Sequence, residues 1–420
     1  MFSLYIKQAW RQLGENRLLT FISIVGTALA IAMIMAMVLA QRVTVEPYAP
    51  ESNRDRLLYV KWMSVKFSGG GNSNGPIGTR TIKEIFNQMQ TPEIVGVYGV
   101  QTTSVLVAVP GGELTNVDCR AVDDKFFKAM DYTFVHGAPF NAGESEAGQS
   151  RVVVTETVAR QLYGTTDVVG RQIEISLKEY TVVGVVKDVS KLTDVAYAQI
   201  WVPYNSTILI ESDWASHVMG MFSVLLLARD KSDFPAIRAE FDQLCLKYNE
   251  LLKSEEMDVF FRGQPDTKIV SNNRLGANYT PNMSRIYWQF AIVVALLLLV
   301  PAINLSGLTL SRMRKRYPEI GVRRAFGAKR SEMLAQILTE SLLLTIIGGA
   351  VGLLLSYVGL FTLGTMLFGN LNNNTLSMAM LFDPMVFVIA FLFCLFLNLL
   401  SAGVPAWRAA RLNIVHALNA

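Results

Sequence analysis

The sequence predicts a membrane protein with four transmembrane α-helices and a large α+β extracytoplasmic domain inserted between helices 1 and 2. Three observations support this fold class. Four long stretches carry no charged residue, basic residues gather on one side of those stretches, and the segment between the first two resembles a soluble domain. Charged residues form 17% of the chain, below the roughly 25% of soluble domains, and the deficit lies in the four stretches.

Each uncharged stretch is long enough to span a bilayer, which requires about 20 apolar residues. The stretches contain 23, 25, 28 and 20 residues, at Leu18–Ala40, Ile286–Leu310, Ser341–Phe368 and Met385–Val404. The first is longer than the roughly 7–15 residues of a signal-peptide core. We therefore expect it to be an uncleaved membrane anchor.

The distribution of Lys and Arg orients these spans, because basic residues near membrane segments stay in the cytoplasm. The chain is basic before span 1, between spans 2 and 3 and after span 4, whereas Gly369–Pro384 has no Lys or Arg. Both termini are therefore predicted to be cytoplasmic. The long segment 42–285 has 25 basic and 29 acidic residues and is predicted to lie outside. The net charge of +4 then reflects membrane topology and does not indicate nucleic-acid binding.

These patterns give a complete order of predicted segments. An amphipathic helix in the first 17 residues is either a membrane-surface anchor or a contact for a cytosolic partner. The expected boundaries are 1–17 for this cytoplasmic helix, 18–41 for span 1, 42–285 for the external domain, 286–311 for span 2, 312–331 for a cytoplasmic loop, 332–368 for span 3, 369–384 for a short external loop, 385–405 for span 4 and 406–420 for a cytoplasmic tail.

Within the external domain, the mixture of helical and strand patterns predicts an α+β fold with a mostly antiparallel sheet. The loop Gly69–Gly78 (GGGNSNGPIG) is predicted to be flexible and without packing capacity. We expect helices at Ile82–Met89, Glu156–Tyr163 (followed by Gly164) and Phe234–Leu252, and strands at Ile94–Val109, Arg151–Thr155, Gln172–Ser176, Tyr180–Val186, Ile200–Pro203 and Met221–Ala228.

Small residues recur at four-residue spacing on two spans, and such spacing lets helices approach closely in lipid. Self-association and packing within the chain are both compatible with it. The residues are Ala28, Ala32, Ala36 and Ala40 on span 1, and Gly348, Gly352 and Ser356 on span 3.

Three polar residues are predicted to lie at lipid depth. Asn304, one turn after Pro301, and Asn398 either hydrogen-bond between helices, the interpretation we favour, or line a path. Glu340 is a candidate functional carboxylate. We favour a structural ion pair with Lys329, Arg330 or a neighbouring helix end, because Glu340 follows the basic loop by only about 15 Å of helix.

The sequence contains no nucleotide-binding loop and no signature of a metalloprotease, redox or hydrolase site. His136, His217 and His416 are scattered, so no metal site is expected. Cys119 and Cys245 could pair outside the membrane, but two buried thiols are favoured. The chain is therefore not predicted to be an enzyme, and any energy source must come from another chain.

The loop between spans 2 and 3 has internal order. Ser311–Arg330 contains eight Lys or Arg and one acid, Glu319. Pro318 suits the first position of a helix and Gly327 the position after its end. Composition alone leaves two interpretations: a short rigid helix that acts as a lever, or a solvated loop that only sets topology.

Three motifs resemble the MacB/FtsX-type ABC transporter permeases. They are EIGVRRAFGAKRSEML at Glu319–Leu334, PAWRAARLNIVHAL at Pro405–Leu418, and the external VVVTETVARQLYGTTDVVGRQI that begins at Val152. The motifs occur in the family's order, and the resemblance covers nearly the whole chain. Ile414–Val415 departs from the family pattern, which often has proline followed by a polar residue.

The resemblance implies an inner-membrane permease that dimerises, with itself or with a paralogue, and recruits two copies of an ABC ATPase carrying ATP and Mg. A periplasmic adaptor is a further candidate partner. The implied role is mechanotransmission for efflux or extraction of hydrophobic, peptide or lipoprotein cargo, and the alternative is an FtsX-like regulator of cell-wall hydrolases. The implied ATPase-coupling residues are Glu319, Ile320, Gly321, Arg323, Arg324 and Gly327.

Overall fold

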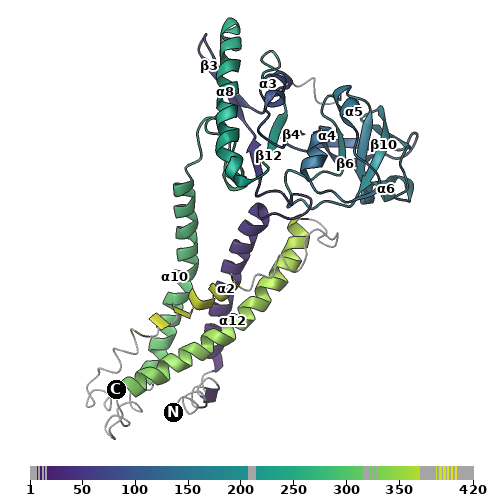
Figure 1. Ribbon diagram of the computed structural model, residues 1–420. Coiled ribbons are helices and arrows are strands. Elements are labelled where there is room, and N and C mark those ends of the chain that lie inside the picture. The colour runs from purple at the N-terminus through teal and green to yellow at the C-terminus, as the bar shows by residue number, and fades with distance from the viewer. Residues whose placement is uncertain are drawn as a thin grey trace. The chain divides into compact units, whose positions relative to one another are not determined.

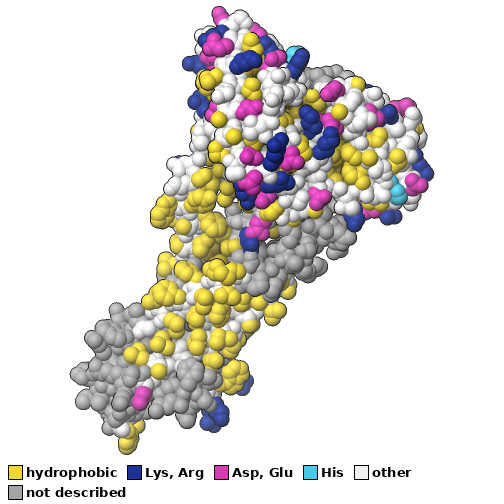
Figure 2. Space-filling model, in the orientation of Figure 1, with side chains coloured by type: hydrophobic (Ala, Val, Ile, Leu, Met, Phe, Trp, Pro, Cys, Tyr) yellow, Lys and Arg dark blue, Asp and Glu magenta, His cyan; other side chains and the backbone are white. Residues whose placement is uncertain are grey.

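The computed structural model describes residues 7, 10, 11, 14, 17–206, 214–315, 322, 326 and 330–368, and part of 385–403. The chain divides into two compact units (Figure 1). The helical unit includes the chain up to Arg42 and Ser284–Leu367, and the sheet unit includes Val43–Met283. Figure 2 shows charged side chains gathered over the sheet unit and mainly hydrophobic ones over the long helices.

Three long helices dominate the described part of the helical unit: α2 (Arg17–Val45), α10 (Met283–Lys315) and α12 (Arg330–Phe368). Among the described residues, α2 and the Leu334–Gly359 part of α12 are long and apolar enough to cross a membrane. The described apolar part of α10, Met283–Leu297, is shorter. The expectation of four spans therefore remains a prediction.

Glycines bring α12 against α2 within the helical unit. A Cβ added at Gly348 would lie 2.8 Å from the Thr27 Cβ, and one at Gly352 would lie 2.7 Å from the Ala28 carbonyl oxygen. At such distances an added Cβ would overlap α2, so glycine is the residue that fits at both positions. The small residues of spans 1 and 3 thus meet each other in this chain, although Ala36, further along α2, is exposed.

The sheet unit is an α+β domain with a ten-stranded sheet and a separate three-stranded sheet, β13-β2-β3. Its strands are β1 (Leu57–Val60), β2 (Met63–Phe67), β3 (Gly71–Gly75), β4 (Ile94–Gly99), β5 (Thr103–Ala108), β6 (Thr115–Val122), β7 (Phe134–Gly137), β8 (Arg151–Thr155), β9 (Gln172–Ile175), β10 (Lys178–Val186), β11 (Ile200–Pro203), β12 (Phe222–Leu227) and β13 (Met257–Phe260). Its α-helices are α3 (Thr79–Glu84), α4 (Asp124–Ala129), α5 (Ala142–Glu146), α6 (Glu156–Tyr163), α8 (Phe234–Leu252) and α9 (Lys268–Asn272).

Part of the large sheet closes on itself. Nine of its ten strands follow the order β1-β12-β4-β6-β11-β8-β10-β9-β5, and the tenth, β7, pairs with β10. Since β5 also pairs with β6, the strands β5, β6, β11, β8, β10 and β9 form a ring. We call these six strands the strand ring. The pairs β6–β11 and β8–β10 are parallel, and the other described pairs are antiparallel. The prediction of a mostly antiparallel sheet is therefore confirmed.

Local patterns placed many elements correctly. The predicted boundaries of β8, α6, β11 and α8 coincide with the observed ones. Gly164 ends α6 at φ 73°, a left-handed conformation that favours glycine. The amphipathic α8 buries Ile237, Phe241, Tyr248 and Leu252 in the larger hydrophobic core.

Two predictions for the sheet unit are wrong. The Gly69–Gly78 segment is not a packing-free loop, because β3 pairs with β2 in register from Gly71 to Gly75 and Ile77 is fully buried. The expected strand Ile94–Val109 is two strands, β4 and β5, which pair with different neighbours. The predicted helix Ile82–Met89 begins earlier as α3 and ends in a 3-10 turn at Phe86–Gln88.

Candidate functional site: a buried ion network at the end of α2

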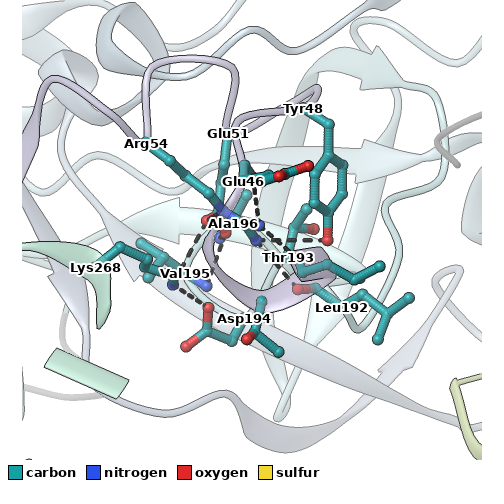
Figure 3. A network of polar contacts seen from close by, with 12 residues as sticks. Glu46, Tyr48, Glu51, Arg54, Leu192, Thr193, Asp194, Val195, Ala196 and Lys268 are labelled. Carbon is teal, nitrogen blue, oxygen red and sulfur yellow. Dashed lines mark hydrogen bonds and ion pairs between the residues drawn. The ribbon is translucent and has the colours of Figure 1, made fainter. Parts of the chain in front are cut away.

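Charged side chains are buried where α2 ends and the chain turns toward β1. Glu51 is 0% exposed, Arg54 2% and Lys268, on α9, 4%. Buried charges are destabilising unless they are paired and hydrogen-bonded. The network that pairs them is shown in Figure 3.

Arg54 uses all five of its N–H donors. Its Nε donates to Glu51 Oε2 at 2.6 Å, and one terminal nitrogen donates to the carbonyl oxygens of Val43 at 2.7 Å and Glu46 at 2.9 Å. The other terminal nitrogen donates to the Leu192 carbonyl at 3.1 Å and to the Tyr48 hydroxyl at 3.5 Å. Val43 lies in the last turn of α2, where carbonyls lack helical partners and a cation is stabilising. Arg54 therefore caps α2.

Glu51 connects this cap to two other segments. Its Oε1 accepts hydrogen bonds from the backbone N–H groups of Val195 at 3.0 Å and Ala196 at 2.9 Å. Its Oε2 lies 3.6 Å from Lys268 Nζ, which also pairs with Asp194. The negative charges of Glu51 and Asp194 balance the positive charges of Arg54 and Lys268. The four side chains link the end of α2 to the 192–196 loop and to α9 (Figure 3).

A second buried arginine organises the chain just before α10. Arg274 forms an ion pair with Asp266 at 2.5 Å and donates to the carbonyls of Arg262 at 3.1 Å and Tyr279 at 3.0 Å. Asn272, two residues before Arg274, connects this segment to α2, because its Nδ2 donates to the Thr44 carbonyl at 3.1 Å. The segments that enter and leave the sheet unit are thus held to each other.

Electrostatics keep the cap charged. Burial by itself would lower the pKa of Arg54, but Glu51 and Tyr48 raise it above its ordinary value. Burial raises the pKa of Tyr48 to about 12, although Arg54 opposes this. Burial likewise raises the pKa of Asp266 despite the opposing effect of Arg274. The arginine at the end of α2 is therefore cationic over the whole physiological pH range.

The network fixes a helix end to two separate parts of a folded domain. Within the described part of the chain, no group of three or more His, Cys, Asp or Glu is placed to hold a metal ion. A displacement of the last turn of α2 would therefore move the 192–196 loop and α9 with it.

The predicted ATPase-coupling residues lie outside the described residues. Within that segment the structure describes Val322 and Phe326, which are 45% and 88% exposed. The Phe326 N–H donates to the Val322 carbonyl at 3.1 Å, a hydrogen bond of the helical i to i−4 type. Two exposed apolar side chains one turn apart are compatible with a docking helix, and the coupling role remains a prediction.

Of the three polar residues predicted to lie at lipid depth, the structure describes the side chain of Glu340. Glu340 is 6% exposed on α12 and shares one helix face with buried Gln336 and Thr339. The side chains of Asn304 and Asn398 lie outside the described part of the chain, as do those of Lys329 and Arg330, the expected partners of Glu340. On span 3, Ser356 is buried and donates to the Leu353 carbonyl at 2.7 Å.

Cys119 and Cys245, both in the sheet unit, are free thiols. Cys119 is buried on β6, and Cys245 packs against the same core from α8. Burial raises the pKa of Cys119 to about 12. The favoured interpretation, two buried thiols that do not pair, is correct for the absence of pairing, although Cys245 is only partly buried.

The ion network was not predicted from the sequence, because no residue pattern in the external domain is chemically distinctive. The one local signal is Glu51 and Arg54 three residues apart just beyond the first apolar span, because that spacing lets the two side chains pair within a turn. Their partners Asp194 and Lys268 are distant in sequence and could not be assigned from it.

Two family models match the chain. The MacB-like periplasmic core domain matches residues 20–244, more than half of the sequence. The FtsX-like permease C-terminal region matches residues 291–414. The chain belongs to the MacB/FtsX-type ABC transporter permeases. The proteins of this MacB/FtsX family are inner-membrane proteins.

Curated relatives are longer than this MacB/FtsX-type chain. The pyoverdine export ATP-binding/permease protein PvdT of Pseudomonas aeruginosa is 24% identical over 98% of this chain and 58% of its own length. The macrolide export ATP-binding/permease protein MacB 1 of Yersinia pestis bv. Antiqua is 27% identical over 72% of this chain and 44% of its own length. The chain therefore spans about half the length of these relatives.

Among solved structures, the periplasmic region of MacB from Actinobacillus actinomycetemcomitans is similar at 14% identity and a TM-score of 0.34. That match covers 51% of this chain and 92% of the other. The extracellular domain of the ABC-type transporter YknZ from Gram-positive bacteria matches at 12% identity and a TM-score of 0.33, over 48% of this chain and all of that domain.

Proposed function

We propose that this permease converts ATP hydrolysis by a separate ABC ATPase into movement of its periplasmic domain, and that this movement drives efflux or extraction of hydrophobic, peptide or lipoprotein cargo. ATP and Mg bind on the ATPase, which is present in two copies. The permease acts as a dimer, with itself or with a paralogue, and a periplasmic adaptor receives the cargo. The termini and the 312–331 loop face the cytoplasm.

The ion network at the end of α2 is the observation that supports this proposal. Mechanical work can reach the periplasmic domain only if the helix end is fixed to it. Arg54 ties the last turn of α2 to the 192–196 loop, and Asn272 ties α2 to the segment that leads into α10. Because α2 is one continuous helix from Arg17 to Val45, a force applied near its cytoplasmic end is carried along its axis.

The decisive experiment separates hydrolysis from movement. The full chain is reconstituted in nanodiscs with the ABC ATPase that co-purifies with it. Nitroxide labels are placed at Leu177 and Tyr287, which are 89% and 55% exposed. We expect ATP and Mg to shift the label-to-label distance distribution of the unmodified chain. We expect Arg54→Met to retain ATP hydrolysis while this shift is lost.

Arg160→Met is the matched control, since Arg160 is an exposed arginine of the same domain, and it should behave like the unmodified chain. A full distance shift in Arg54→Met would refute transmission through the network. If ATP moves neither the unmodified chain nor the control, the proposed function itself is wrong.

The coupling loop is tested separately by reversing its charge. We expect Arg323→Glu combined with Arg324→Glu to prevent co-purification of the ATPase, while membrane insertion is unchanged. Arg314→Glu combined with Lys315→Glu makes the same charge change at the end of α10, outside the predicted coupling helix, and should retain the ATPase. Equal loss in both double variants would show that loop charge, and no particular docking helix, recruits the ATPase.

A further inference from the structure

The 192–199 segment connects the ion network to the strand ring. On one side, Arg54 holds the segment at the Leu192 carbonyl, and Glu51 holds it at two backbone N–H groups. On the other side, the segment leads directly into β11, a ring strand. Loops are more mobile than the elements they connect. A loop that was free to bend would therefore absorb a displacement of α2 before it reached the ring.

Arg120 holds this loop from the side of the ring. It lies on β6, a ring strand, and is 4% exposed. One terminal nitrogen donates to the Asp194 carbonyl at 2.8 Å, and Nε donates to the Tyr197 carbonyl at 3.0 Å. The other terminal nitrogen donates to the Gly99 carbonyl, at the end of β4, at 2.6 Å. One side chain thus fixes two points of the loop to β6 and β4.

Arg120 is a buried cation without an acidic partner. Its three hydrogen bonds all go to backbone carbonyls, and no carboxylate among the described residues forms an ion pair with it. Burial lowers its pKa, and nearby tyrosines, Tyr98 first among them, oppose this effect. Packing alone would favour an apolar side chain of similar volume. The arginine therefore serves the three carbonyls that it joins, which need a fork of donors.

Further contacts fix the same loop to the ring. The Tyr197 hydroxyl donates to Asp118 Oδ2 on β6 at 2.7 Å. Gln199 Oε1 accepts from the Asp118 N–H at 2.9 Å, and the Gln199 N–H donates to the Asp118 carbonyl at 2.8 Å. Ala196 is fully buried in one hydrophobic core with Trp201 of β11. Together with Arg120, these contacts make the loop a rigid extension of the ring.

The ring is joined to the rest of the large sheet by little backbone pairing. β4 is the neighbour of β6 outside the ring, and the register between them consists of the single pair Tyr98 and Val122. By comparison, β12 pairs with β4 at six positions. Side-chain contacts across this boundary, such as that between Arg120 and Gly99, therefore matter more for how the ring is held.

A second route from α2 leads to α8 and does not include Arg120. Lys268 of α9 lies 3.6 Å from Glu51 Oε2, and Asn272 bonds to the end of α2. Arg238 of α8 donates to the Pro265 carbonyl, just before α9, at 3.1 Å. The movement of α8 can therefore serve as an internal reference for the movement of the ring.

We propose that Arg120 is the positioning residue through which the strand ring follows the end of α2. It keeps the 192–199 loop rigid, so that a displacement of α2 moves the six ring strands as a body and does not bend the loop. This inference rests on the proposed function, because it concerns how an ATP-driven movement is distributed within the periplasmic domain.

Two pairs of nitroxide labels test the inference in the full chain, reconstituted in nanodiscs with its co-purifying ATPase. Both pairs share Tyr287 on α10. The partner is Leu177 in the ring for one pair and Leu246 on α8 for the other, and these residues are 89% and 69% exposed. We expect ATP and Mg to shift both distance distributions in the unmodified chain. In Arg120→Met, the shift of the 177 pair should be lost and that of the 246 pair retained.

Arg171→Met is the matched control, since Arg171 is an exposed arginine beside β9 of the ring, and both of its shifts should be normal. Folding is checked by the distance between labels at 177 and 246 without nucleotide. Should Arg120→Met differ from the unmodified chain in that distance, Arg120→Gln, which leaves a hydrogen-bond donor in the core, replaces it.

The outcomes separate this inference from the proposed function. A normal shift of the 177 pair in a folded Arg120 variant would overturn the inference and leave the proposed function standing. Loss of both shifts in a folded variant would also overturn it, because Arg120 would then not act on the ring in particular. If ATP shifts neither pair in the unmodified chain, the proposed function itself fails.

Discussion

Arg54 shows why arginine, and not lysine, is required at the end of α2. Its planar guanidinium reaches five acceptors, four on the continuous stretch 43–51 and one in the 192–196 loop, and its Cζ lies 4.4 Å from the centre of the Tyr48 ring. A lysine ammonium has three donors on one nitrogen and cannot reach both the helix end and the Leu192 carbonyl. The geometry of a single side chain therefore sets how firmly the helix is joined to the domain.

The first prediction concerns this residue. Arg54→Met should lower the free energy of unfolding by about 3–5 kcal/mol, because it leaves buried Glu51 without its charge partner. Arg54→Lys should lose less. Arg160→Met, which breaks an exposed contact of 3.9 Å with Glu156, should change it by no more than about 1 kcal/mol. Urea unfolding of the full chain followed by tryptophan fluorescence checks this, and equal losses in both Met variants would contradict it.

The second prediction concerns the pH dependence that Asp123 imposes. Burial raises its pKa from 3.8 to about 7, so between these pH values the folded chain binds a proton that the unfolded chain releases. The contribution of this group to stability is full below pH 4 and is lost as the pH rises through about 7. We therefore expect the melting temperature of Asp123→Asn to rise relative to the unmodified chain between pH 4 and pH 8. Exposed Asp167→Asn should show no such trend.

At the scale of elements, the contact between α2 and α12 depends on glycine at particular positions. A side chain at Gly352 would meet the Ala28 backbone, which cannot move aside as a flexible side chain could. Gly359, on the same helix, has nothing within 4 Å of an added Cβ. The two positions therefore provide a matched pair of substitutions.

The third prediction uses this pair. Gly352→Leu should destabilise the helical unit by about 1–3 kcal/mol, the usual result of overpacking. Gly359→Leu should leave its stability nearly unchanged. Thermal unfolding of the full chain in nanodiscs measures both. If the two variants melt together, α2 and α12 do not pack as described.

Local sequence signals predicted elements well wherever one residue pattern decides the structure. The α6 helix has a Thr155 cap, an apolar face and Gly164 at its end, and its predicted boundaries are correct. β3 was missed because GNSNG has no strand propensity, and it forms only because β2 offers a partner. Likewise, β4 and β5 were predicted as one strand because they form one mainly apolar run, and no local residue pattern shows that they pair with different strands.

At the scale of the whole molecule, the candidate site could not be predicted, because its residues come together only in the fold. Glu51 and Val195 are 144 positions apart, and no periodicity relates them. Membrane orientation, in contrast, follows from charge distribution, which needs no tertiary information, and it remains a prediction.

The fourth prediction tests that topology. Cysteines at Leu177 and Val322, which are 89% and 45% exposed, are introduced singly into a chain whose three native cysteines are replaced by alanine. A membrane-impermeant maleimide should label residue 177 in intact spheroplasts, and residue 322 only after permeabilisation. Labelling of both positions from one side would overturn the predicted orientation.

The strand ring has a consequence for a domain that moves repeatedly. Strands at a sheet edge present unpaired N–H and C=O groups on which other chains can assemble. Each of the six ring strands is paired on both sides within the ring, so the ring itself offers no free edge on which another chain could assemble. Closure thus protects these six strands against edge-to-edge aggregation, even though Leu106 and Leu177 remain exposed on the ring's surface.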